Sequence, residues 1–242
     1  MKTAYIVKAY RTAVGKAPKG VFRFKRPDEL AAETIQFMMN ELPDFDKTRI
    51  DDVMVGNAMP EAEQGLNVGR LISLMGLKVT DVPGVTVNRY CASGLETIGM
   101  ATAKIQSGMA DCIIAGGAES MSFIPMGGYK PTPDYAVAAA GNEDYYWGMG
   151  LTAEAVAKQY SISREDQDEF AFNSHQKALK AQAEGKFDKQ IVPINVEQTF
   201  INENGKKETK TYTVSKDEGP RADTNRSEER RVGKECCSRC RS

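Results

Sequence analysis

The sequence has very little histidine, which excludes several kinds of catalytic centre. His175 is the only histidine among 242 residues, and its neighbours along the chain are polar. One histidine cannot build a metal site of the usual kind, so neither metal catalysis nor a bound metal is expected. The sequence context predicts a solvated helix face for His175 and not the role of a catalytic base.

Long apolar runs and an excess of one charge are also missing. No run reaches the roughly 18 apolar residues that a membrane span requires, and residues 1–15 lack the apolar stretch of a secretion signal. The formal charge is −1, which gives no reason to expect nucleic acid or an anionic membrane as a partner. Hydrophobic residues make up 41% of the chain and charged residues 27%, as in ordinary soluble proteins. We expect a cytoplasmic protein.

Disulfide and phosphate-loop patterns are absent as well. Cys91 and Cys112 stand alone in the body of the chain, which is too few for a disulfide framework and fits a reducing compartment. The glycine clusters lack both the Gly-Lys-Ser/Thr ending of a phosphate loop and the spacing of a dinucleotide-binding loop. Tight turns are therefore their expected use, and no cofactor is predicted.

Apolar runs alternate with amphipathic segments over the first 120 residues. This order predicts an α/β fold with a mostly parallel sheet and helices on both faces. The predicted strands are residues 5–7, 52–56, 82–87 and 111–117, and the predicted helices are residues 26–42, 68–75 and 95–105.

The pattern changes after Gly117. Residues 121–150 are rich in Gly, Pro and Tyr with little periodicity, which is typical of a functional loop region. Helices are predicted at residues 152–160 and 164–184, the second one capped by Ser163. An exposed strand of alternating Lys and Thr is predicted at residues 206–214.

Cys91 is the strongest candidate for chemistry. It lies where a predicted buried strand runs through a tight turn into a helix. The exposed amides and the dipole of a helix N-terminus favour a thiolate, which is the attacking species in acyl transfer. The alternative is an inert cysteine that fills the joint between sheet and helix, and topology alone leaves both open. Cys112, inside an apolar run, is expected to be a small core residue.

At Asn88-Arg89-Tyr90-Cys91-Ala92-Ser93-Gly94-Leu95 the sequence resembles the thiolase family, closest to its acetyl-CoA acetyltransferase and 3-ketoacyl-CoA thiolase members. Further segments resemble the family in the same order, up to about Thr224. These segments are Arg11-Thr12-Ala13-Val14-Gly15, Gly116-Gly117-Ala118-Glu119-Ser120-Met121-Ser122, Met149-Gly150-Leu151-Thr152-Ala153-Glu154, Ser163-Arg164-Glu165-Asp166-Gln167-Asp168 and Asp217-Glu218-Gly219-Pro220-Arg221.

The resemblance implies a thiolase-type fold, with a five-stranded sheet in an α/β domain at residues 1–120 and a loop domain over coenzyme A at residues 121–224. It also implies an acyltransferase of fatty-acid metabolism. Cys91 would attack the keto carbon of a 3-ketoacyl-CoA, release acetyl-CoA and keep the shortened acyl chain as a thioester. The reverse reaction would join two acetyl-CoA molecules. The Cys91 amide would contribute to an oxyanion hole.

Two binding residues and the partners follow from the same resemblance. Met149 would lie near the acyl end of the substrate and Arg221 beside the nucleotide. Arg221 is equally well interpreted as a surface charge next to Glu218. Coenzyme A and acyl-CoA are expected as substrates and not as bound cofactors. The parent enzyme is expected to be a homodimer or homotetramer, because family members commonly are.

The chain also departs from the family. The Asn-Glu-Ala-Phe, Gly-His-Pro and Cys-x-Gly-Gly-Gly segments of the family's second half are not in the sequence, so the C-terminal repeat of the fold is expected to be absent. Residues 225–242 resemble a translated sequencing adapter and are expected to form a disordered, artefactual tail. The alternative is that Cys237 and Cys240 form a redox or zinc pair.

Little or no turnover is expected from this chain, because the family's histidine activates the nucleophile and the loss of a general base costs roughly 10²- to 10⁴-fold in rate. Two other functions remain open. One is a ketoacyl-synthase-like condensing enzyme, against which residues 148–154 argue. The other is a non-catalytic module that binds coenzyme A or a thiolase subunit.

Overall fold

A computed structural model describes residues 2–224, which divide into two compact units. The first unit comprises residues 2–130 and 188–219, and the second comprises residues 131–187 and 220–224. The boundaries differ from the expected 1–120 and 121–224 because residues 188–219 pack with the first unit, so those domain ranges stay a prediction. The tail at 225–242, with Cys236, Cys237 and Cys240, lies outside the described residues.

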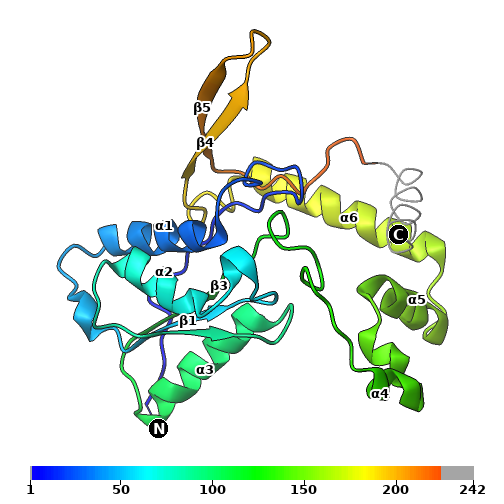
Figure 1. Cartoon of the computed structure of the whole chain (residues 1–242), viewed down its shortest axis with the longest axis horizontal. Helices are drawn as coiled ribbons and strands as arrows, with labels where there is room; N and C mark the ends of the chain where they lie inside the picture. Colours follow the sequence, from blue (N-terminus) through cyan, green and yellow to red (C-terminus); the bar gives the residue numbers. More distant parts are fainter. Residues whose placement is uncertain (1, 225–242) are drawn as a thin grey trace. The chain divides into compact units, whose positions relative to one another are not determined.

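A three-stranded parallel sheet forms the centre of the first unit (Figure 1). Its order is β2-β1-β3, and Val53 in the central strand faces Gly84 on one side and Ile114 on the other. All five residues of β1 are buried, as expected for a strand with helices on both faces. This confirms the α/β class with a parallel sheet. The strands are β1 (Asp52–Gly56), β2 (Gly84–Val87) and β3 (Ile113–Gly117).

The five strands expected in this sheet are not all found among the described residues. Residues 5–7 were expected to form a strand, but they belong to no helix or strand, and each residue is 79% exposed. The segment is anchored near both ends, where the Lys2 amide donates to the Gln106 carbonyl and the Arg11 amide donates to the Gln190 carbonyl. The expected strand at residues 5–7 is therefore wrong, because strand formation depends on pairing with a neighbouring strand that the local sequence does not reveal.

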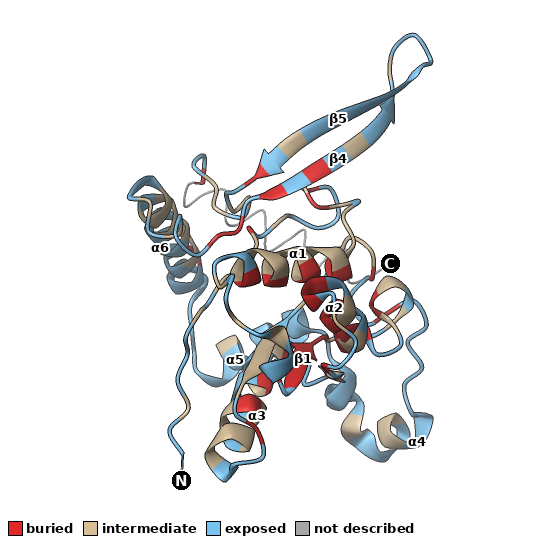
Figure 2. Cartoon of the chain, turned by 90° about the vertical axis from the view of Figure 1, so that its left-hand side faces the viewer, coloured by how far each residue is buried: buried red, intermediate tan, exposed pale blue. Residues whose placement is uncertain are grey.

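Helices cover both faces of the sheet. Helices α1 and α2 lie on one face and α3 on the other (Figure 1). Val53 and Val55 join Ile35 and Ile72 in the core beneath α1 and α2, and the buried residues concentrate there (Figure 2). Met54, which points to the opposite face by strand alternation, is also fully buried. The helices are α1 (Pro27–Asn40), α2 (Val68–Leu77) and α3 (Ser93–Ser107), with short 3₁₀ turns at Lys47–Arg49 and Ala62–Gln64.

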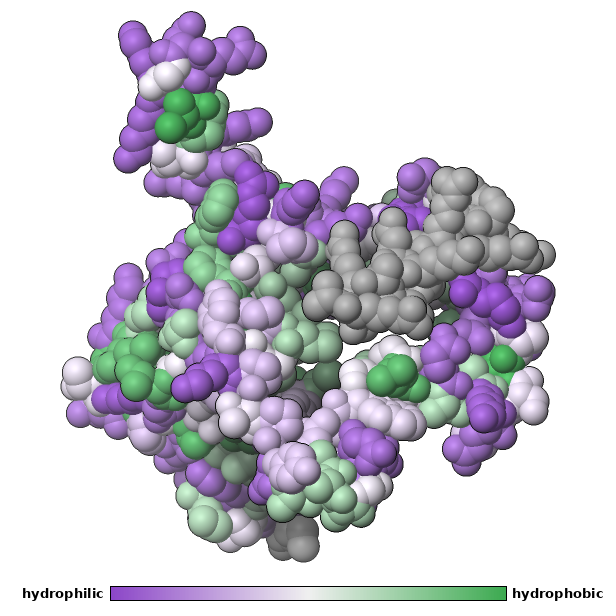
Figure 3. Space-filling view, turned by 45° about the vertical axis from the view of Figure 1, so that its right-hand side comes forward, coloured by the Kyte–Doolittle hydropathy of each residue, from purple (hydrophilic) through white to green (hydrophobic). Residues whose placement is uncertain are grey.

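An antiparallel hairpin completes the first unit. Strands β4 (Ile194–Ile201) and β5 (Lys207–Val214) pair along their whole length. The expected strand at residues 206–214 is confirmed, and it is largely exposed. Buried residues are confined to the base of the hairpin, and its outer part is mainly hydrophilic (Figure 3).

The second unit is helical. The Ser163 cap predicted for its long helix is confirmed, since the Ser163 hydroxyl and the Asp166 carboxylate form a reciprocal capping box. Within the described residues no helix combines the length and the apolar character that crossing a membrane would require. The helical segments are α4 (Tyr135–Val137), a π turn (Ala138–Asn142), a 3₁₀ turn (Glu143–Tyr146), α5 (Met149–Gln159) and α6 (Arg164–Ala183).

Asp217 links the end of the first unit to its N-terminal loop. Its two carboxylate oxygens accept hydrogen bonds of 2.7 and 3.0 Å from the Arg11 guanidinium, and one of them also accepts from the Val14 amide at 2.8 Å. The bonds from Arg11 lower the pKa of the Asp217 carboxyl; burial opposes this effect, and the Val14 amide adds to it. The ionised carboxylate is thus favoured by folding.

We predict that Asp217→Asn lowers the free energy of unfolding by about 1.5–3 kcal/mol at pH 7, the usual size of a hydrogen bond to a charged group. Because the pKa of Asp217 is lowered on folding, its contribution is present above the unfolded pKa of about 3.9 and is lost as pH falls through the folded pKa. The difference between the native chain and the variant should therefore shrink below about pH 4. Urea unfolding followed by circular dichroism at pH 7 and at lower pH measures it.

Asp111→Asn is the matched control, since Asp111 pairs with Lys2 at 2.6 Å but both side chains are exposed. It should cost less than about 0.5 kcal/mol. Equal losses from the two variants would contradict a special role for Asp217.

Candidate active site

Cys91 lies in a tight turn between β2 and α3. The turn occupies residues 88–92, α3 begins at Ser93, and the Cys91 side chain is exposed. The strand–turn–helix setting predicted from the sequence is confirmed. The turn leaves the carboxyl end of β2, and in parallel sheets ligands usually bind at this end of the strands.

Side chains on both flanks hold this turn. The Ser93 hydroxyl accepts a hydrogen bond from the Arg89 amide at 2.9 Å and donates to the Tyr90 carbonyl at 2.5 Å. The Asn88 carboxamide oxygen accepts from the Tyr90 amide at 2.9 Å. Tyr90 has φ of 48°, in the left-handed region, which costs energy for a side chain other than glycine. The residue before the cysteine is thus strained and fixed by its neighbours.

Gly56 allows α3 to approach the sheet closely. A Cβ built on Gly56, the last residue of β1, would lie 2.5 Å from the Ser93 carbonyl oxygen and 2.6 Å from the Gly94 nitrogen. No side chain fits there. The first turn of α3, which begins two residues after Cys91, therefore lies directly against the end of the central strand.

Cys112 differs from Cys91 in its surroundings. It is partly buried and packs against the hydrophobic core. Burial raises the pKa of the Cys112 thiol, and the nearby Asp51 carboxylate adds to this effect. Cys112 is therefore a poor nucleophile, in keeping with the expected role of a core residue.

Met149 and Arg221 lie in the second unit. Met149 is the first residue of α5 and is 60% exposed. The Arg221 guanidinium donates from Nε to the Thr224 hydroxyl at 3.0 Å, and the Arg221 amide donates to His175 Nδ1 at 3.3 Å. Because Cys91 belongs to the first unit, the expected grouping of these residues around one substrate stays a prediction.

His175 corrects one detail of the expectation. It lies in α6 as predicted, but it is half-buried and accepts a hydrogen bond from Arg221, so its helix face is not simply solvated. The sequence could not indicate this contact because it joins residues 46 positions apart. Over residues 2–224, no group of three or more His, Cys, Asp or Glu side chains is placed to hold a metal ion.

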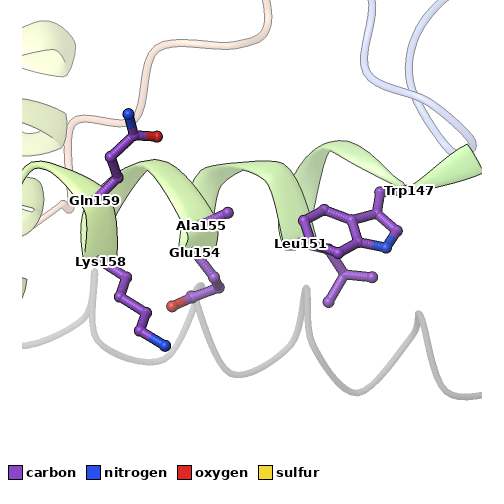
Figure 4. Close-up of a pocket in the computed structure, with 6 residues that line it drawn as sticks. All are labelled: Trp147, Leu151, Glu154, Ala155, Lys158 and Gln159. Atoms are coloured by element: carbon purple, nitrogen blue, oxygen red, sulfur yellow. The ribbon is translucent and has the colours of Figure 1, made fainter. Parts of the chain in front are cut away.

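A shallow pocket follows one side of α5 in the second unit (Figure 4). Trp147 and Leu151 supply its apolar part, and Glu154 and Lys158 bring charge further along the helix. The sequence did not single out this surface. The four-residue spacing of Trp147, Leu151 and Ala155, which places them on one helix face, was the available signal.

The chain is similar to several known proteins. Residues 4–231 match the family model "Thiolase, N-terminal domain". The chain is 51% identical over 225 residues to the 3-ketoacyl-CoA thiolase of Bacillus subtilis (strain 168), covering 93% of this chain and 57% of that protein. It is 38% identical over 239 residues to the beta-ketoadipyl-CoA thiolase of Acinetobacter baylyi (strain ATCC 33305 / BD413 / ADP1), with the same coverages of 93% and 57%.

A solved structure is also similar. The crystal structure of the Bacillus anthracis acetyl-CoA acetyltransferase superposes with a TM-score of 0.72 at 31% sequence identity, covering 91% of this chain and 55% of that one. The chain spans about half the length of the relatives that it matches.

The two cysteines give a prediction about reactivity. Iodoacetamide at neutral pH should alkylate Cys91 about tenfold or more faster than Cys112, because Cys91 is exposed and the Cys112 thiol is partly buried. Peptide mass spectrometry over a time course measures both rates in the same sample. Equal rates in the folded chain, with both rising together only in urea, would show that Cys91 is not the accessible thiol.

Gly56 gives a prediction about packing. Gly56→Ala should lower the free energy of unfolding by about 1–3 kcal/mol, because the added methyl group must displace the first turn of α3. Gly99→Ala, in α3 itself, is the control, since a Cβ at Gly99 meets nothing within 4 Å. The control should be neutral or stabilising by up to about 1 kcal/mol. Urea unfolding distinguishes the two, and a harmless Gly56→Ala would contradict the close contact.

Proposed function

The chain belongs to the thiolase family, and we propose from this premise that Cys91 is the nucleophile of a coenzyme A-dependent acyl transfer. The observation that carries the proposal is an exposed cysteine just before the N-terminus of α3, in a turn that side-chain hydrogen bonds hold. Free amides and the dipole at a helix N-terminus favour negative charge on a nearby sulfur.

The proposed reaction has two balanced halves. The Cys91 thiolate attacks the keto carbon of a 3-ketoacyl-CoA, the adjacent carbon–carbon bond breaks, and acetyl-CoA leaves after its new carbanion takes up a proton. The shortened acyl chain stays on Cys91 as a thioester. The thiolate of free coenzyme A then attacks this thioester and returns the electron pair to the Cys91 sulfur. The reverse direction would condense two acetyl-CoA molecules.

The oxyanion formed in each half needs hydrogen-bond donors. The Cys91 amide, immediately before α3, is the donor that we propose from this chain. The general base that the family uses for proton transfer is not in this sequence, which contains no Gly-His-Pro segment. His175 accepts a hydrogen bond from Arg221 in the second unit. We therefore propose that this chain acylates Cys91 but turns over slowly, since loss of a general base costs roughly 10²- to 10⁴-fold.

Met149 and Arg221 are the proposed binding residues of the second unit. The exposed Met149 side chain offers a flexible apolar contact to an acyl or pantetheine chain. The Arg221 guanidinium offers a charge suited to a phosphate of coenzyme A. Acyl-CoA and coenzyme A are thus the proposed substrates, and a homodimer or homotetramer is the proposed state of the whole enzyme. The chain-length preference is the finer part of the proposal: the matched relatives are named for both 3-ketoacyl and beta-ketoadipyl substrates.

Acyl transfer to Cys91 gives the main test. Incubation with acetyl-CoA or acetoacetyl-CoA should produce an acyl adduct on Cys91 that peptide mass spectrometry locates, and Cys91→Ala should abolish it. Cys112 in the same chain is the internal control and should stay unmodified. A full-length thiolase treated in parallel confirms that the reagents work.

Other outcomes would favour other functions. If acetyl-acyl carrier protein acylates Cys91 while acetyl-CoA does not, the chain is a ketoacyl-synthase-like enzyme. If coenzyme A binds but no adduct forms while the control thiolase is labelled, the chain is a binding module and the proposed acyl transfer is wrong.

A further inference from the structure

Asn88 connects the nucleophile turn to the loop that follows β1. Its carboxamide nitrogen donates to the Ala58 carbonyl at 3.0 Å, while its oxygen accepts from the Tyr90 amide at 2.9 Å. The Asn88 carboxamide therefore forms hydrogen bonds through both its nitrogen and its oxygen. We propose that Asn88 is a positioning residue that keeps Cys91 at the N-terminus of α3, an inference that rests on the proposed role of Cys91 as nucleophile.

The Ala58 end of this connection is itself held by a chain of hydrogen bonds. The Ala58 amide donates to one Glu119 oxygen at 2.6 Å, and the Gln64 amide nitrogen donates to the other at 2.6 Å. Gln64 is fully buried, and its oxygen accepts from the Ser120 amide at 2.5 Å. Asn88 thus joins the turn to a buried side chain through a continuous series of contacts.

The backbone of the turn explains why such support is needed. Tyr90 holds a φ of 48°, and strained residues keep such a conformation only when their surroundings over-determine it. Asn88 holds the Tyr90 amide, and Ser93 holds the Tyr90 carbonyl. Without the contact from Asn88, Tyr90 can relax toward an ordinary backbone conformation and take Cys91 with it.

The contribution of Asn88 can be separated chemically. Asn88→Asp keeps an oxygen that can accept from Tyr90 but replaces the amide nitrogen with a second oxygen facing the Ala58 carbonyl. Two acceptors then face each other, so the connection breaks at Ala58. Asn88→Ala removes both contacts. Each change should loosen the turn and move the sulfur out of the field of the α3 N-terminus.

The test measures alkylation of Cys91 by iodoacetamide at neutral pH in the chain as it exists. Asn88→Asp and Asn88→Ala should slow it by roughly two- to fivefold, the size of a lost helix-dipole interaction. Cys112 alkylation in the same samples reports general loosening of the first unit, so the ratio of the two rates identifies an effect confined to the turn. A merely structural role would raise Cys112 alkylation and leave no selective loss at Cys91.

Asn202→Asp is the matched control. The Asn202 carboxamide is also used at both ends, donating to Glu208 and accepting from the amides of Asn204 and Lys206, but it lies at the tip of the hairpin. This variant should leave both cysteine rates unchanged. Glu119→Gln is the second variant if a change at Asn88 prevents folding, because it weakens the far end of the same chain of hydrogen bonds and should also slow Cys91 selectively.

The outcomes are distinct. Unchanged Cys91 alkylation in the Asn88 variants, or parallel changes at Cys91 and Cys112 in both Asn88→Asp and Glu119→Gln, overturns the positioning role. Acylation by acetyl-CoA, measured on the native chain, decides the proposed function separately. A native chain that is never acylated but shows the selective loss of alkylation would refute acyl transfer and still support the placement of Cys91 by Asn88.

Discussion

The close packing of α3 on the carboxyl end of β1 is the constraint on which the site depends. Gly56 has no side chain, so the backbone at Ser93 can lie directly against the strand. One turn further along, the fully buried Thr97 hydroxyl lies 2.8 Å from the Gly94 carbonyl oxygen of α3 itself and 3.0 Å from the Gly116 carbonyl oxygen of the neighbouring strand β3. A helix placed this way brings its first turn to the carboxyl edge of the sheet, directly after the turn in which the exposed Cys91 lies.

Contacts between residues far apart along the chain then hold the loops around this centre. Asp217 binds Arg11 across 206 residues, and Glu218 accepts from the amides of Lys16 and Val21. Carboxylates that bind backbone amides satisfy donors which a loop could not satisfy by itself. The loop after β1 is held in a similar way, since Glu119 accepts from the Ala58 amide. Polar contacts therefore hold these loops, while apolar packing holds α1 and α2 against the sheet.

Local signals in the sequence predicted those parts of the fold that depend on neighbouring residues. Pro27 at the start of α1 and the Ser163 box at the start of α6 are examples, and both helices begin where these residues indicate. The strand–turn–helix position of Cys91 is local in the same sense. Pairing is not local, so the sequence could not reveal that residues 5–7 have no partner strand among the described residues. Strand β4 was not predicted for a related reason. It is recognised as a strand by its pairing with β5, which the local sequence does not show. The contact between His175 and Arg221, and that between Arg11 and Asp217, join distant positions without a periodic signal.

Cys91 and Cys112 show why position and not residue type decides reactivity in this fold. Both are free thiols in the same unit, next to parallel strands of the same sheet. Cys112 precedes β3 and packs against the core, where burial disfavours its thiolate. Cys91 follows β2, at the opposite end of the strands, where the chain turns outward into a helix N-terminus.

A parallel sheet directs all its carboxyl ends to one edge, so the turns that leave this edge are both open to solvent and adjacent to helix N-termini. A nucleophile that relies on a helix N-terminus is therefore proposed at Cys91 and not at Cys112, and Asn88 and Ser93 are the side chains that bind the backbone of its turn.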